Sequence, residues 1–209
     1  MREEDKIVIK LKHQFDMIWE SLKSLEYLIN FPKYLKLTNN NKPKDLWFLY
    51  FVIRNNTVLN LNKLFNPSED YSFDKTKRLL IKDFDKTDEK INQILVTLKK
   101  GKKLFEKLDL KNIRDKHVGH LDENRTEKNL NWNEVKELVL ISCDIHDKMN
   151  LFAFNQQSAW FIYAKILNSI FTNDLKSKEL FELRRELFRE NQKTTSRDKI
   201  LELTKKNWP

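Results

Sequence analysis

Glycine and proline are scarce in this chain. Only two glycines and four prolines occur among its 209 residues. Folds built from β-hairpins and tight turns need more of both, because glycine supplies positive φ angles and proline presets the turn. The shortage therefore argues against an all-β fold and favours long helices with few connections.

Cysteine and long apolar runs are also nearly missing. Cys143 is the only cysteine, so no internal disulfide framework is expected. The longest apolar stretch, residues 151–171, is interrupted by polar residues at 155–157 and by Lys165. The first six residues lack the apolar core of a signal peptide. We therefore expect a cytoplasmic protein that does not enter a membrane.

Positive charge is in excess, with a formal net charge of +9. Such a balance favours an anionic partner, and nucleic acid is the first candidate. A lysine-rich and asparagine-rich composition also arises from genome composition alone, and the charge does not separate the two explanations. Apolar residues make up 40% of the chain, which is enough to form a core and argues against global disorder.

Most of the chain repeats apolar residues at steps of three and four, as Leu11, Phe15, Ile18 and Leu22 do. This spacing places the apolar side chains on one face of a helix. It predicts helices over residues 7–31, 45–65, 77–108, 131–152, 158–171 and 177–190. The expected fold class is all-α, a bundle of long antiparallel helices. We expect a single domain over residues 1–192, followed by a polar tail over residues 193–209.

Several residues mark the expected helix ends. Phe31-Pro32 should end the first helix, because proline disfavours a helical residue before it. Asp45, Asn112 and either Asn131 or Asn133 are expected as N-caps, Asn112 for a helix beginning at Ile113. Residues 66–76 are expected to be irregular, with Phe73 docking back onto the core.

One short stretch, residues 113–122 (Ile-Arg-Asp-Lys-His-Val-Gly-His-Leu-Asp), does not follow the apolar pattern. It contains two of the four histidines and one of the two glycines. Charged side chains are rarely buried without partners, so a core role does not explain this cluster. On a helix, Arg114, His117 and His120 fall along one stripe, because they are spaced by three.

The stripe suits phosphate chemistry. Arginine binds phosphate oxygens with two parallel hydrogen bonds and stabilises the extra negative charge of a phosphoryl transition state. Histidine titrates near neutrality and can act as a general acid or base. RNA carries its own nucleophile, the 2′-OH, so no metal or other cofactor is required. Geometry alone does not choose between His117 and His120.

Two other interpretations of the stretch remain. A metal site from His117, His120 and Asp122 fits no strong metal motif, and Arg114 and Lys116 would repel a cation. Alternatively, Arg114 and its neighbours only bridge helices while the histidines are solvated. A further lysine run around Gly101, residues 99–103, either binds phosphate or forms the solvated side of an amphipathic helix.

Arg114, followed by the polar Asp115 and then by His120, resembles the Arg-x(4–6)-His signature of the HEPN superfamily, here with five intervening residues. The stretch is particularly similar to prokaryotic HEPN proteins of abortive infection. The resemblance covers about ten residues, and HEPN proteins are helical bundles. It implies a metal-independent endoribonuclease with Arg114, Asp115 and His120 as catalytic residues. We assign Lys116 and His117 to substrate binding.

The resemblance also implies partners. HEPN domains dimerise so that two motifs face one cleft, and many act as toxins or phage-defence effectors. The expected partners are therefore RNA, a second copy of the chain, and an antitoxin or another defence-system protein. HEPN toxins paired with a nucleotidyltransferase antitoxin carry Tyr where this chain has Asp122, so neutralisation by modification of that Tyr is not expected.

Two features support a homodimer independently of the resemblance. The segments that begin the second and fifth expected helices, residues 46–53 and 160–163, carry more apolar surface than one bundle face needs.

The main alternative to a ribonuclease is a non-catalytic helical module that binds RNA or a protein. A third possibility is a scaffold with an incidental basic surface.

Overall fold

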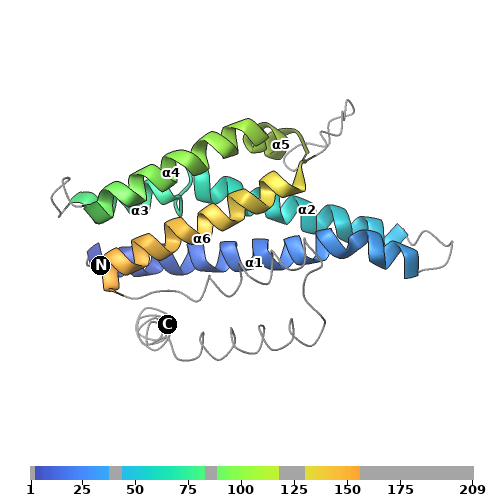
Figure 1. The fold of residues 1–209 in the computed structure, drawn as a ribbon, viewed down its shortest axis with the longest axis horizontal. Helices are drawn as coiled ribbons and strands as arrows, with labels where there is room; N and C mark the ends of the chain where they lie inside the picture. The colour runs from blue at the N-terminus through green and yellow to red at the C-terminus, as the bar shows by residue number, and fades with distance from the viewer. Residues whose placement is uncertain (1–2, 38–43, 83–88, 118–129, 156–209) are drawn as a thin grey trace, which may run out of the picture.

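The computed structural model describes residues 3–37, 44–82, 89–117 and 130–155 (Figure 1). These residues form six helices and, within these ranges, no strand. The prediction of an all-α bundle with long antiparallel helices is confirmed. The expected helices at 158–171 and 177–190 and the tail at 193–209 lie outside the described residues.

The longest helix, α1 (Glu3–Leu37), forms one side of the bundle. Its apolar stripe is buried at Leu11, Ile18, Leu22 and Leu25, as the spacing predicts. The predicted end at Phe31-Pro32 is wrong, because α1 continues through Pro32. Proline has no N–H to bond the carbonyl four residues earlier, which normally weakens a helix.

Aromatic packing between α1 and α2 (Lys44–Phe65) stabilises the turn that precedes Pro32. The ring of Phe31 lies 5.1 Å from that of Trp47 and 4.7 Å from that of Tyr50. The two helices run antiparallel in Figure 1. Because α2 begins at Lys44, Asp45 lies in its first turn and is not the N-cap that the sequence predicted.

A short connection, residues 66–72, leads into α3 (Phe73–Lys82). Phe73 is fully buried against Phe65, with ring centroids 5.4 Å apart, so the predicted docking of Phe73 is confirmed. The predicted helix start near residue 77 is wrong by one turn. Ser72 Oγ accepts a hydrogen bond from Lys75 N (3.4 Å), which makes Ser72 the N-cap.

Helices α4 (Glu89–Leu108) and α6 (Trp132–Phe154) pack as an antiparallel pair above α1 (Figure 1). Gly101 of α4 lies where α4 approaches Phe65 of α2 and Ile141 of α6, and a Cβ there would come within 2.5 Å of the Phe65 ring. Glycine therefore permits the close approach of these helices.

The lysines beside Gly101 form ion pairs that join helices. Lys100 pairs with Glu137 at 3.0 Å, and Lys102 pairs with Asp74 at 2.5 Å. Lys100 and Glu137 are both exposed, as expected for the solvated face of an amphipathic helix, which was the second interpretation of this lysine run. Lys102 instead reaches the buried carboxylate of Asp74.

The chain reverses between α4 and α5 (Leu110–His117) at Asp109, whose φ is 57°. Aspartate tolerates this left-handed conformation better than most residues. The first helical hydrogen bond of α5 runs from Ile113 N to Asp109 O (3.1 Å). Asn112 is therefore inside the helix and is not its N-cap, which corrects the prediction.

The N-cap of α6 is Asn131, one of the two residues that the sequence predicted. Its side chain accepts a hydrogen bond from Asn133 N at 3.1 Å. Cys143 and His146 are both buried in the core. His146 Nε2 donates to the backbone carbonyl of Leu11 in α1 (3.0 Å), so this histidine joins two helices.

Among the described helices, none is both long and apolar enough to cross a membrane.

Candidate active site

The structure describes part of the predicted catalytic set. The side chains of Arg114 and Asp115 project from α5. The backbone of Lys116 and His117 forms the end of that helix, while their side chains lie outside the described part of the chain. His120 lies outside the described residues altogether. The structure therefore describes the part of the candidate site around Arg114 and Asp115.

Arg114 and Asp115 form a tight pair on α5. One carboxylate oxygen of Asp115, Oδ1, lies 2.8 Å from Arg114 Nε and 2.8 Å from Arg114 Nη2. It therefore accepts along one edge of the guanidinium. Charge-assisted contacts with two donors fix both the position and the plane of the arginine head group.

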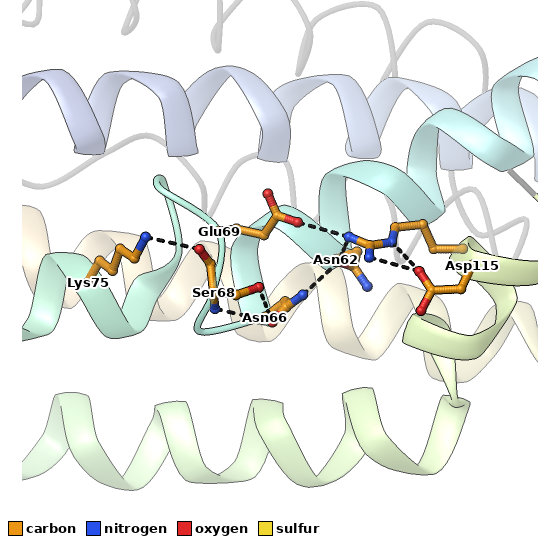
Figure 2. A network of polar contacts seen from close by, with 7 residues as sticks. Asn62, Asn66, Ser68, Glu69, Lys75 and Asp115 are labelled. Carbon is orange, nitrogen blue, oxygen red and sulfur yellow. Dashed lines mark hydrogen bonds and ion pairs between the residues drawn. The ribbon is translucent and has the colours of Figure 1, made fainter. Parts of the chain in front are cut away.

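Two residues distant in the sequence hold the other side of the guanidinium (Figure 2). Arg114 Nη1 donates to Asn62 Oδ1 of α2 at 2.9 Å and to Glu69 Oε1 of the 66–72 connection at 2.8 Å. Asn62 is completely buried, whereas the side chains of Glu69 and Arg114 are 30% and 28% exposed. The arginine thus has one buried neutral partner and one partly solvated anionic partner.

The 66–72 connection brings Glu69 to this position because its backbone is well anchored. Asn66 Oδ1 accepts from both the backbone N and the hydroxyl of Ser68, at 3.2 and 2.9 Å. Gln14 of α1 donates to the carbonyl of Tyr71 (2.8 Å), and Lys75 of α3 donates to the carbonyl of Ser68 (3.0 Å). The connection is therefore tied to α1, α2 and α3 on both sides of Glu69.

Electrostatics keep Arg114 charged. The pKa of its guanidinium is raised, first by the hydrogen bond to Asp115, and Glu69 adds to the effect while partial burial opposes it. One positive charge faces two carboxylates, so the local balance in this state is one negative charge. This net negative charge would repel a further anion that approaches Arg114.

Asn62 and Glu69 were missed by reasoning from the sequence. They precede Arg114 by 52 and 45 residues, and no local spacing connects them to it. The signals in the sequence were the polar Asn62 between the apolar Leu61 and Leu64, and a turn sequence, Asn66-Pro67-Ser68, that fixes the chain just before Glu69.

Metal ligation was the weaker alternative for this stretch. No group of three histidine, cysteine, aspartate or glutamate side chains with metal-binding geometry occurs in the described part of the chain. The triad considered from the sequence, His117, His120 and Asp122, lies outside the described side chains, so it is not tested.

The two other histidines do not join the site. His146 is in the core, and burial lowers its pKa to about 4. His13 packs on Tyr71, with ring centroids 4.2 Å apart.

Comparison of the chain with protein-family models, with curated proteins and with solved structures gives no match.

Proposed function

We propose that this chain is a HEPN-type endoribonuclease that cuts RNA without a metal ion and acts in the cytoplasm as a toxin or phage-defence effector. The observation that carries the proposal is the fixed guanidinium of Arg114, the first residue of the Arg-x5-His motif, held from α2, α5 and the 66–72 connection. A preorganised positive group is what a phosphoryl transition state requires.

The proposed reaction is attack of the ribose 2′-OH on the adjacent phosphorus. The 2′-O–P bond forms, and the bond from phosphorus to the 5′-oxygen breaks. His120 accepts the proton that the 2′-OH loses and returns a proton to the leaving 5′-oxygen, while Arg114 stabilises the charge on the non-bridging oxygens. Asp115 orients Arg114, and Lys116 and His117 contribute to RNA binding. The products are a 2′,3′-cyclic phosphate and a 5′-OH.

The proposal includes a second copy of the chain as partner. Five apolar side chains of α2 are exposed, with Phe48 the most exposed at 71%: Trp47, Phe48, Leu49, Phe51 and Val52. Pairing of two copies would cover this surface and bring two motifs to one cleft. An antitoxin or another defence-system protein is the further partner that a toxin role requires.

The deciding experiment is cleavage of RNA by the purified protein in EDTA. We expect fragments with 2′,3′-cyclic phosphate and 5′-OH ends by mass spectrometry, and no cleavage of DNA, which lacks the 2′-OH. Products with a 5′-phosphate, or loss of activity in EDTA, would indicate metal-assisted hydrolysis instead. Light scattering at micromolar concentration should give the mass of a dimer.

A non-catalytic module that binds RNA or a protein is the second candidate. It is favoured by the extent to which Arg114 is already occupied by protein groups. Binding of RNA without any cleavage, by protein whose Arg114 and His120 are intact, would select this alternative.

A further inference from the structure

The hydrogen-bond donors of Arg114 are almost all in use. A guanidinium has five N–H groups. Nε–H and one Nη2–H face Asp115, and the two on Nη1 bond to Asn62 and Glu69. Within the described part of the chain, this leaves a single Nη2–H. A phosphate is normally bound by two parallel N–H groups, so a protein acceptor must leave before phosphate can bind in this way.

The three acceptors differ in how easily they leave. Asp115 contacts two nitrogens and adjoins Arg114 in the chain. Asn62 is completely buried, so water cannot replace Arg114 as a partner of its Oδ1. Glu69 makes a single contact to Nη1, and its side chain is already 30% exposed. Glu69 therefore leaves at the lowest cost, because water can solvate its carboxylate.

We propose that the carboxylate of Glu69 occupies the position of a substrate phosphate on Arg114, and that RNA binds by exchanging one of its phosphates for Glu69. This inference rests on the proposed function, in which Arg114 binds RNA. Departure of Glu69 frees one N–H of Nη1, the nitrogen next to the one that carries the unused Nη2–H. Asn62 and Asp115 then keep the guanidinium in place while it accepts the new anion.

The exchange needs only a side-chain rotation. The backbone on both sides of Glu69 is held by Gln14, Lys75 and the Asn66 turn, so the connection itself stays in place. Figure 2 shows Glu69 reaching from this connection to the arginine head group, with Ser68 and Asn66 below it in the view. In the resting state, Glu69 prevents weakly bound anions from occupying Arg114.

Binding of RNA that cannot be cleaved tests the exchange. The probe is an oligonucleotide with 2′-O-methyl riboses, titrated by fluorescence anisotropy. Glu69→Gln keeps a hydrogen-bond acceptor for Arg114 and removes the competing charge. We expect its Kd to fall about fivefold, the scale of a partly exposed ion pair. Glu69→Ala serves as a second variant if Glu69→Gln is poorly folded.

Asp70→Asn is the matched control. It makes the same charge change one residue away, at a carboxylate that pairs with Lys75 and whose side chain is 85% exposed. Its Kd should stay within about twofold of wild type, because solvent screens an exposed charge. In an Arg114→Lys background, the gain from Glu69→Gln should disappear, since lysine lacks the paired N–H groups.

The results separate the exchange from the proposed function. Tighter binding by Glu69→Gln that depends on Arg114 supports the exchange even if the wild-type protein cuts no RNA. If wild-type protein cuts RNA but Glu69→Gln binds like Asp70→Asn, the exchange is wrong and the ribonuclease proposal stands. Weaker binding or a lower kcat for Glu69→Gln would also overturn the exchange, and would make Glu69 a positioning residue.

Discussion

Asn62 and Arg114 are 52 residues apart in sequence, yet the side chain of Asn62 accepts a hydrogen bond from Arg114 Nη1 at 2.9 Å. Asn62 is completely buried in α2, and Arg114 reaches it from α5. The contact ties the start of the motif to the centre of the bundle. It also makes the orientation of Arg114 depend on a residue that lies wholly inside the bundle.

The first prediction concerns Asn62→Ala, which should lower both stability and RNA cleavage. Loss of the acceptor costs about 1–2 kcal/mol and frees the guanidinium to rotate. Asn60→Ala is the matched control, because Asn60 is also buried in α2 but donates to Glu20 (3.0 Å) and not to Arg114. Thermal unfolding and cleavage rates are measured together. Equal loss of activity in both variants would contradict a specific role for Asn62.

Arg114 itself gives the second prediction. The sequence alone suggests that Arg114→Ala loses activity without loss of stability. Its bonds to Asn62 and Glu69 change that expectation, since removing the guanidinium leaves the buried Asn62 Oδ1 with only the long hydrogen bond from Asn66 Nδ2 (3.4 Å). We expect cleavage to fall at least about 100-fold and stability to fall by about 1–2 kcal/mol. Urea unfolding that matches wild type would show that these contacts contribute nothing to stability.

The two histidines of the motif give the third prediction. His120→Ala should lower cleavage at least about 100-fold, the scale for loss of an acid–base group, whereas His117→Ala should mainly weaken RNA binding. Rates at saturating RNA separate the two effects. If His117→Ala is inactive while His120→Ala cuts normally, the assignment taken from the HEPN pattern is wrong.

The fourth prediction is a pH effect on stability from His146. Its pKa is lowered from 6.5 to about 4 by burial, so the folded protein favours the neutral ring. The unfolded state binds more protons between these values, and stability is therefore lost as pH falls from 6.5 to 4, by about 3 kcal/mol. His146→Gln can still donate to the Leu11 carbonyl and should show a flatter profile. The difference between the two proteins isolates His146, and identical slopes would contradict this origin.

Gly101→Ala gives the fifth prediction. Alanine is normally favoured over glycine inside a helix by about 1 kcal/mol. Here, its Cβ would come within 2.5 Å of the Phe65 ring and 3.0 Å of the Ile141 side chain. Phe65 is held between Phe73 and Phe105, so it cannot move aside freely. We expect a net loss of about 1–3 kcal/mol in thermal unfolding.

Val96→Ala is the control for that variant. Val96 lies on the same helix and is 66% exposed, so alanine should be neutral or slightly stabilising there. A Gly101→Ala protein at least as stable as wild type would mean that α4 can shift away from α2 and α6.

The helices were predictable because burial imposes a spacing that the sequence displays directly, as at Leu11, Ile18, Leu22 and Leu25. The residues at which the helices begin and end were harder to predict. Pro32 stays within α1, where Phe31 packs on α2, and Ser72 caps α3 earlier than the apolar pattern indicates. Helix ends depend on single hydrogen bonds and on contacts with other helices, which a local pattern does not record.

The candidate site shows the same limit. Arg114 and Asp115 are adjacent, so their pairing can be expected from the sequence. Asn62 and Glu69 reach the site only because α5 packs on α2 and because the 66–72 connection returns beside it. Their contribution depends on tertiary packing, and no local spacing in the sequence connects them to Arg114.

The burial of Cys143 offers a way to follow all of these variants without introducing a label. Its thiol is the only one in the chain, it lies in the core on α6, and burial raises its pKa well above the ordinary value. An aromatic disulfide reagent therefore reacts only when α6 separates from its neighbours. The reaction releases a coloured thiolate, and the rate of its release reports the opening of the bundle. One molecule of reagent is consumed for each chain that unfolds.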